Sequence, residues 1–382
     1  MIGLGHGGRA TEIAIVSEVS VGYGTPQVIR LADTLASAFG ATVIIYEPDQ
    51  PERPAVDIAR HARSARVRVQ RVVTSSHPYG TAGRIEFCLA VSKELNEHRP
   101  RVIVVCASYG LPIFYDIDPS QSFNIFYCLE HIPENPEPTF GLVGKSCNLV
   151  LFPERNRARI YAPRLGIVGN RQEIMIVMNG NYPREGLPGE KERIPRVFYG
   201  GTFHREMTCA DIFLESDIAR YPIDVYGIID GFPDRAAIAR QMHGNEGGIR
   251  YCGYLEADDV YFETLARYQY SLVIWNPSND AQLYAAPNKM FDAIACGVPP
   301  LCAPHPQCEE IIRRWQCGVM FDNWSVKAVR ARLEQVIATF GTTFHDRLVL
   351  QCKAAMNGGL DWDSQCDPVV KAVARGFGQS IR

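Results

Sequence analysis

The sequence predicts an α/β protein made of two Rossmann-like, doubly wound domains that face a cleft. Three observations lead to this fold class. From Glu12 onward, short apolar runs alternate with longer stretches of helical spacing, as in repeated βαβ units. The run from Tyr270 to Trp275 is apolar along most of its length, which is typical of a parallel strand covered on both faces. The alternation stops once and restarts, and 382 residues suit two or three domains of about 150 residues each.

The first series of elements predicts a domain over residues 1–181. Its strands are expected over residues 12–19, 41–46, 67–73, 102–106, 124–129, 148–152 and 174–177. Helices between these strands include residues 26–39 and 81–98. Residues 182–195 contain three prolines and two glycines without an apolar period, so they are predicted to link two domains.

The second series predicts a domain over residues 196–364. Its strands are expected over residues 196–199, 223–226, 249–252, 271–275, 299–302 and 318–321, and its helices over 258–267, 288–296, 309–315 and 326–340. Open α/β sheets bind ligands beyond the carboxyl ends of their strands. We therefore expect the functional residues in the loops that follow strands.

Composition excludes several classes of protein. A net charge of −3, from 39 Lys and Arg against 42 Asp and Glu, disfavours broad binding to nucleic acid. No apolar run approaches the roughly 18 residues of a membrane span, and the first residues lack the apolar part of a secretory signal, so a cytoplasmic protein is expected. The 12 cysteines form no C-x-x-C pair and are predicted to be reduced core thiols. The glycines at positions 3, 5, 7 and 8 precede the first strand and are interpreted as a leader, not as a dinucleotide site.

Glycines follow the first predicted strand of each domain. Gly22 and Gly24 precede the helix 26–39, where backbone amides and a helix N-terminus would face a ligand, although a plain tight turn explains them equally well. In the second domain, Gly201 follows the first strand and Arg205 lies just beyond it, a combination that suits a diphosphate. The alternative for Arg205 is a surface cation without a ligand.

The most informative pattern lies in one short predicted helix. Pro287 precedes it, Asn288 is expected to cap it and Gly297 to end it. Lys289 and Asp292 are three residues apart and therefore share a face of its first turns. A cation and a carboxylate placed there suit the phosphates and the ribose hydroxyls of a nucleotide. An i,i+3 surface ion pair is the alternative.

This helix resembles the P-x-K-x-x-E/D-Y/A-x-A-x-G-x-P segment of the GT-B glycosyltransferases, through Pro287, Lys289, Asp292, Ala295, Gly297 and Pro299. The resemblance implies that Lys289 contacts a nucleotide diphosphate and that Asp292 contacts its ribose. It also covers Gly22 and Gly24 before the helix 26–39, Gly201, and Tyr254. Together with Arg205, these residues are expected at the donor site. A last helix that begins at Trp362 is implied to cross back to the first domain over residues 365–382.

The sequence departs from the retaining members of that family at one position. Tyr284 stands eight residues before Asp292, where those members often have the first Glu of an E-x7-E motif. The preceding loop offers Asn279, Asp280 and Gln282 instead, so the sugar contact is either rebuilt from these residues or lost.

Glu130 and His131, at the end of a predicted buried strand, are the expected catalytic residues of the first domain. The resemblance implies that a side chain there reaches the sugar, either to deprotonate an acceptor hydroxyl or to stabilise an oxocarbenium-like sugar. A hydrogen-bonded strand-end histidine is the alternative for His131. Asp116 and Asp118 are weaker candidates for the base.

The resemblance thus implies a hexosyltransferase-type enzyme that moves a sugar from a UDP- or GDP-linked donor to a hydroxyl acceptor. Metal independence, no cofactor and retention of configuration are expected, and a nucleotide-sugar epimerase or a non-catalytic glycosyltransferase-like subunit is the alternative. The expected acceptor is a glycan, a lipid-linked molecule or a small molecule, with no nucleic acid. Arginines at positions 60, 63, 66, 68 and 71 would attract an anionic acceptor or the inner face of a membrane, unless they form only a solvated surface.

Overall fold

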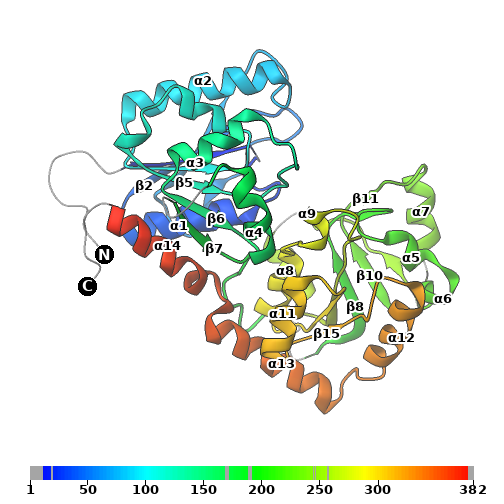
Figure 1. The fold of residues 1–382 in the computed structure, drawn as a ribbon. Helices are drawn as coiled ribbons and strands as arrows, with labels where there is room; N and C mark the ends of the chain where they lie inside the picture. Colours follow the sequence, from blue (N-terminus) through cyan, green and yellow to red (C-terminus); the bar gives the residue numbers. More distant parts are fainter. Residues whose placement is uncertain are drawn as a thin grey trace. The chain divides into compact units, whose positions relative to one another are not determined.

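The computed structural model describes residues 12–18, 20–167, 172–187, 192–243, 245, 247–255 and 258–376. The glycines at positions 3, 5, 7 and 8 and part of the predicted linker lie outside these ranges. The chain divides into two compact units, Met1–Met178 with Gln365–Arg382, and Asn179–Ser364. Each unit surrounds a parallel sheet with helices, as the sequence predicts (Figure 1).

The first unit is built on seven parallel strands in the order β3-β2-β1-β4-β5-β6-β7. The strands are β1 Glu12–Ser17, β2 Thr42–Pro48, β3 Val67–Val72, β4 Val102–Cys106, β5 Phe123–Tyr127, β6 Leu149–Phe152 and β7 Glu173–Ile176. The α-helices between them are α1 Pro26–Phe39, α2 Thr81–His98, α3 Val143–Ser146 and α4 Arg155–Arg164. Short 3-10 turns occupy Ile58–Arg60, Leu111–Tyr115, Pro119–Gln121 and Pro138–Leu142.

The strand order of this sheet reverses at one point. The chain passes from β1 to β2 and β3 in one direction and then returns to place β4 on the other side of β1. Ligands of open α/β sheets bind beyond the carboxyl ends of the strands at such a reversal. The residues that follow β1 and β4 are called the first switch point below.

The main sheet of the second unit has six parallel strands in the order β12-β10-β8-β13-β14-β15. They are β8 Ile194–Gly200, β10 Ile223–Tyr226, β12 Arg250–Tyr251, β13 Tyr268–Val273, β14 Pro300–Cys302 and β15 Val319–Met320. Its α-helices are α5 Ala210–Leu214, α6 Ser216–Ala219, α7 Arg235–Met242, α8 Asp258–Leu265, α9 Asp280–Leu283, α10 Asn288–Ala295, α11 Pro306–Trp315, α12 Val326–Ile337 and α13 Thr343–Ala355. The order reverses between β8 and β13, and the residues that follow these two strands are called the second switch point.

Two short strands lie apart from that sheet. β9 Phe203–His204 and β11 Ile229–Asp230 pair in parallel beyond the ends of β8 and β10. They hold the loops after β8 and β10 next to each other, which positions part of the second switch point.

The C-terminal segment begins in the second unit and ends in the first. A π-helical turn, Met356–Leu360, follows α13 and includes Gly359 with a φ of 103°. The last helix, α14 Trp362–Gly376, begins at a fully buried tryptophan, and its residues from Gln365 onward belong to the first unit. There Arg375 forms an ion pair with Glu173 of β7 at 2.9 Å.

Two predictions from composition concern the state of the cysteines and the presence of membrane-spanning helices. All the cysteines are buried except Cys252, which is half-buried, in agreement with the predicted core thiols. Of the helices in the described ranges, none combines the length and the apolar character that a membrane crossing requires.

Candidate functional site

The amino group of Lys289 lies at the second switch point. Its Nζ is 4.8 Å from the ring centroid of Tyr199, the next-to-last residue of β8, and 4.4 Å from that of Trp275, which follows β13. The attraction of an ammonium group to aromatic faces holds the side chain in this place. The structure therefore brings the predicted lysine to the position where the fold binds ligands.

Gly201 makes room for this lysine. A Cβ atom on Gly201 would lie 3.0 Å from Cε and 3.3 Å from Nζ of Lys289. Its φ of +113° also disfavours any residue with a side chain. Position 201 therefore requires a glycine for two reasons: its φ disfavours other residues, and a side chain would crowd Lys289.

Burial lowers the pKa of Lys289 to about 8, and the nearby carboxylate of Asp292 partly opposes this shift. The amino group is still mostly protonated at neutral pH. Among the described residues Lys289 forms no ion pair, and its Nζ donates one hydrogen bond of 3.5 Å to Tyr199 OH. A phosphate could replace the solvation that burial removes from this ammonium group, so the site is chemically suited to an anion.

Asp292 lies on the same helix, α10, and is half-buried. Its Oδ1 accepts a hydrogen bond of 2.7 Å from Nδ2 of Asn181, which is almost completely buried. Asn181 therefore fixes the carboxylate, and no sequence pattern identified it. The expected cap was wrong: Asn288 is the first helical residue, and Pro287 occupies the cap position without a side-chain hydrogen bond.

Three glycines line the carboxyl edge beside Lys289, one after each of β8, β10 and β12. Gly201 N–H donates to Tyr226 O, and Gly227 N–H donates to Gly253 O at 2.7 Å. A Cβ on Gly227 would lie only 2.1 Å from the carbonyl oxygen of Gly201. Backbone segments therefore approach each other so closely here that no side chain fits. Gly227 was not predicted from the sequence, although it follows a predicted strand as Gly201 and Gly253 do.

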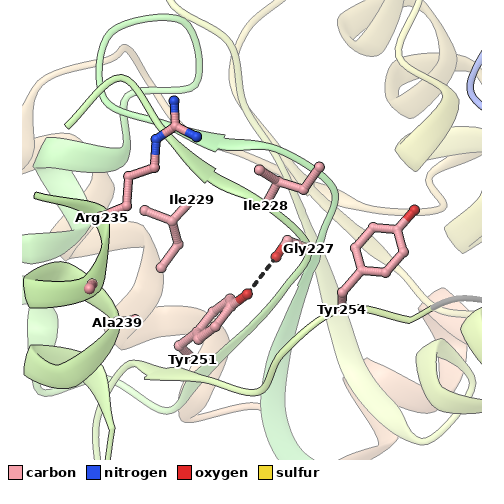
Figure 2. A pocket seen from close by; sticks show the side chains of 8 residues that line it. Gly227, Ile228, Ile229, Arg235, Ala239, Tyr251 and Tyr254 are labelled. Carbon is pink, nitrogen blue, oxygen red and sulfur yellow. Dashed lines mark hydrogen bonds between the residues drawn. The ribbon is translucent and has the colours of Figure 1, made fainter. Parts of the chain in front are cut away.

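A pocket of about 440 Å³ lies at the ends of β10 and β12 (Figure 2). It is lined by Gly227, Ile228, Ile229, Arg235, Ala236, Ala239, Tyr251 and Tyr254. Tyr251 OH donates to the carbonyl oxygen of Gly227 at 2.8 Å, and the predicted Tyr254 is 63% exposed at the rim. The pocket is mainly apolar and has aromatic walls, which suits a flat aromatic group.

Arg205 is exposed just after β9. Its side chain makes no hydrogen bond or ion pair within the described part of the chain, and its backbone N–H donates to Asp230 O. Two residues later, the carbonyl of Met207 accepts from the N–H of Asn276, so this segment lies against the loop after β13. Arg205 is thus placed beside the second switch point without a partner of its own there.

The loop with the altered E-x7-E position is held at both ends by His305. This buried histidine accepts from the N–H of Trp275 through Nε2 at 3.2 Å, and its Nδ1 lies 3.2 Å from Leu283 O. These contacts require a neutral ring with its proton on Nδ1, and burial lowers the pKa of His305 accordingly. Within the loop, Asn279 caps α9 by accepting from Gln282 N–H.

In the first unit, Gly22 and Gly24 form the turn before α1, with φ of 86° and 142°. The turn is anchored by Glu47, whose Oε2 accepts from Val21 N–H at 2.6 Å and whose Oε1 pairs with Arg71. The turn therefore has a defined shape at the carboxyl end of β1.

The predicted catalytic residues Glu130 and His131 follow β5 and are both exposed. His131 Nδ1 lies 2.9 Å from the hydroxyl of Tyr161. Arg157 and Arg164 of α4 donate to Leu129 O and Ile132 O, which fixes the backbone of this loop. The two side chains thus project from a rigid loop at the carboxyl edge of the sheet.

Glu18, which the sequence analysis missed, lies at the first switch point. Its Oε2 accepts from the N–H of Tyr109 at 3.3 Å, which joins the loops after β1 and β4. Burial and then the charge of Glu130 raise its pKa to about 7. The sequence does show an acidic residue directly after the first strand. It identifies Glu18 as a switch-point residue only once β4 is known to lie beside β1.

Two sequence hypotheses need correction. Asp118 lines a small cavity with Arg99 and Pro100, which precede β4, so it lies at the amino edge of the sheet, away from the ligand-binding edge. Its oxygens accept from Ser120 and Gln121, and these hydrogen bonds lower its pKa, so it serves a turn. The basic run is also smaller than predicted, because Arg71 is paired with Glu47 and Asp49.

Within the described ranges, no group of three or more His, Cys, Asp or Glu side chains could hold a metal ion. Metal independence stays a prediction.

The fold can be compared with known structures. No protein-family model and no curated protein matches this sequence. Sucrose-phosphate synthase from Thermosynechococcus elongatus matches with a TM-score of 0.68 and 15% identity over 97% of this chain and 100% of that one. HepE from Anabaena, in complex with UDP and glucose, matches with a TM-score of 0.69 and 13% identity over 96% and 100%. A glycosyltransferase from Rickettsia africae matches with a TM-score of 0.70 and 9% identity over 97% and 100%.

This chain has the GT-B fold. The GT-B fold was predicted from the segment around Lys289, and the structural matches confirm it over nearly the whole chain. In this GT-B chain, Lys289, Asp292, Gly201 and Tyr254 all occur in the second unit, on loops or helices beside the carboxyl edge of one sheet.

Proposed function

We propose that this chain is a glycosyltransferase that moves a sugar from a UDP- or GDP-linked donor to a hydroxyl acceptor. In this proposal the second unit binds the donor and the first unit binds the acceptor. The observation that carries it is the Lys289 amino group at the second switch point, desolvated and resting on two aromatic rings beside Gly201. A cation held there suits the diphosphate that departs when the sugar is transferred.

The other parts of a nucleotide have matching partners around Lys289. The N-terminus of α10 adds a positive dipole end for the phosphates. The carboxylate of Asp292 suits the ribose hydroxyls, and the pocket beside Tyr254 suits the base. Arg205 is a second cation for the phosphates. These groups neutralise the leaving diphosphate with protein charges, so we propose a metal-independent reaction.

Structures with this fold support a nucleotide-sugar donor. HepE was determined with UDP and glucose, and a trehalose-phosphate synthase from Burkholderia xenovorans is described as UDP-forming. Retention of configuration is proposed because the segment around Lys289 resembles retaining members. In the first unit, Glu130 and His131 would stabilise the positive charge that develops on the sugar.

The test is turnover with a panel of UDP- and GDP-sugars, each with and without a mixture of hydroxyl acceptors, followed by NMR. We expect release of UDP or GDP and a new glycoside with retained anomeric configuration, lost in Lys289→Ala and kept in Lys327→Ala. Lys327 is the matched control because it is an exposed lysine of the same unit. An epimerised donor without acceptor would contradict transfer, and binding without any turnover would favour a non-catalytic subunit.

A further inference from the structure

We propose that His305 is a positioning residue of the donor site, and that its ring holds Trp275 against the ammonium group of Lys289. This inference rests on the proposed function, which makes Lys289 the cation for the diphosphate. It adds a residue that acts on the lysine through a shared neighbour, Trp275.

His305 lies in the loop between β14 and α11 and is completely buried. β14 pairs with β13, and the N–H of Ala303 donates to Val273 O, so the loops after these two strands start side by side. The sheet thereby brings His305 to Trp275, although the two residues are 30 positions apart in the sequence.

Trp275 is fixed on both sides of its backbone. Its N–H donates to Nε2 of His305 at 3.2 Å, and its carbonyl accepts from Nε1 of Trp324 at 2.6 Å. The rings also pack edge to face, because the His305 centroid lies 6.1 Å from that of Trp275 and 5.4 Å from that of Trp324. His305 and Trp324 together therefore hold both the backbone and the indole of Trp275.

The indole of Trp275 in turn forms part of the surroundings of Lys289. Its ring centroid lies 4.4 Å from Nζ, and the ring of Tyr199 lies 4.8 Å away. Burial lowers the pKa of Lys289 to about 8. If Trp275 moved away, water would reach the ammonium group and its pKa would return toward the ordinary value of 10.5. The pKa of Lys289 thus reports the position of Trp275 without any ligand.

The other ring nitrogen of His305 bonds a different segment. Nδ1 lies 3.2 Å from Leu283 O at the end of α9, so a neutral ring with its proton on Nδ1 donates there and accepts from Trp275 through Nε2. Two substitutions separate these roles. The Oε1 of a glutamine matches Nε2 and can still accept from Trp275, whereas the Nδ2 of an asparagine matches Nδ1 and can donate only to Leu283 O.

The test is a pH titration of Lys289 by NMR on the full chain with ¹³C-labelled lysine, together with calorimetry of UDP-glucose and GDP-mannose. We expect His305→Asn to raise the pKa of Lys289 from about 8 toward 10.5 and to weaken nucleotide-sugar binding about tenfold. His305→Gln, which keeps the bond to Trp275, should recover most of both effects. In the wild type, a histidine ¹⁵N spectrum should show the neutral ring of His305 with its proton on Nδ1, a readout that needs no variant.

His345→Asn is the matched control. His345 is a second buried histidine of the same unit, and its Nε2 lies 2.7 Å from the carbonyl oxygen of Gln269, near the start of β13. Its replacement should lower stability but leave the pKa of Lys289 and the nucleotide affinity unchanged.

An unchanged pKa of Lys289 in His305→Asn, an equal rise in His345→Asn, or a proton on Nε2 of His305 in the wild type would overturn the inference. A response of that pKa as expected, without binding of any nucleotide sugar, would contradict the proposed function and leave the positioning of Lys289 by His305 in place.

Discussion

Lys289 combines a positive charge with a half-buried, aromatic environment, and this combination makes its charge sensitive to pH. Because burial lowers its pKa to about 8, the free protein loses the ammonium charge above that pH. A bound diphosphate would raise the pKa again, since it favours the charged form.

The affinity for UDP should therefore be constant below pH 8 and fall by about tenfold per pH unit above it, until the pKa of the complex is reached. Calorimetry from pH 6.5 to 9.5 measures this. Lys289→Arg, whose guanidinium stays charged, should bind with a flat profile over the same range. An equal decline in the arginine variant would show that another group titrates.

Gly201→Ala tests the space beside that lysine. The added Cβ would lie 3.0 Å from Lys289 Cε, so the amino group must move, and we expect UDP affinity to fall about tenfold. Gly341→Ala is the control, because Gly341 also has a positive φ but has no atom within 4 Å of a built Cβ. Both variants should lose about 1 kcal/mol of stability from backbone strain. Equal UDP binding by the two would contradict the placement of Lys289.

The residues predicted from the sequence belong to a local motif. The residues that were missed are recognised only by their contacts with residues far away in the sequence. Lys289 and Asp292 share a helix face, which spacing alone reveals. Glu18 becomes meaningful only when β4 is known to lie beside β1, and Asn181 only when its amide is seen to reach Asp292. Contacts between residues 91 or 111 positions apart leave no local pattern.

Among the secondary-structure elements, four strands of the second sheet are joined by one buried carboxylate. Asp224 of β10 accepts from Arg196 of β8 and Arg250 of β12, each at 2.6 Å, and from the hydroxyl of Tyr268 in β13 at 2.7 Å. It is completely buried, so its charge depends on these partners.

Asp224→Asn should lower the free energy of unfolding by about 3 kcal/mol, because it leaves two arginines without their common carboxylate. Asp217→Asn removes an exposed ion pair with Arg330 and should cost about 0.5 kcal/mol. Denaturant unfolding of both variants measures the difference. Similar losses would mean that Asp224 does not join the strands as described.

Prediction of the elements worked where local sequence sets the boundaries. α1 and α2 have the predicted bounds, and Gly40 ends the first of them with a φ of 61°. β13 begins at Tyr268, three residues earlier than expected, because pairing with β8 extends it. α4 was missed because its many arginines hide its buried face, and β9 and β11 because two-residue strands show no period.

The first unit is not continuous in sequence, because most of α14, which follows the second unit in the chain, belongs to it. Val369 and Val373 of this helix are completely buried. The stability of the first unit should therefore depend on a segment almost 200 residues beyond β7 in the sequence.

Val373→Asp should destabilise the first unit by more than about 3 kcal/mol, since it buries a charge without a partner. Lys371→Ala, at an exposed position of the same helix, should change stability by less than about 0.5 kcal/mol. Hydrogen exchange should show lost protection in β1, β4 and β5, with β8 and β13 unaffected. Equal loss in both units would contradict the division at Gln365.

The fold class followed from the sequence because its signals repeat along the chain: alternating strands and helices, a Pro- and Gly-rich segment, and one motif. The structural matches confirm that the GT-B fold extends over nearly the whole chain at identities of 9–15%. The proposed function depends on a few side chains at the switch points, so it must be tested on those residues.

Calorimetric titration of UDP and GDP into the wild type, Lys289→Ala and Lys327→Ala tests the central claim most directly. We expect at least one nucleotide to bind the wild type and Lys327→Ala equally, and Lys289→Ala about 100-fold more weakly, because the lost charge is desolvated. Unchanged affinity in Lys289→Ala, or no binding of either nucleotide to the wild type, would contradict a donor site at the second switch point.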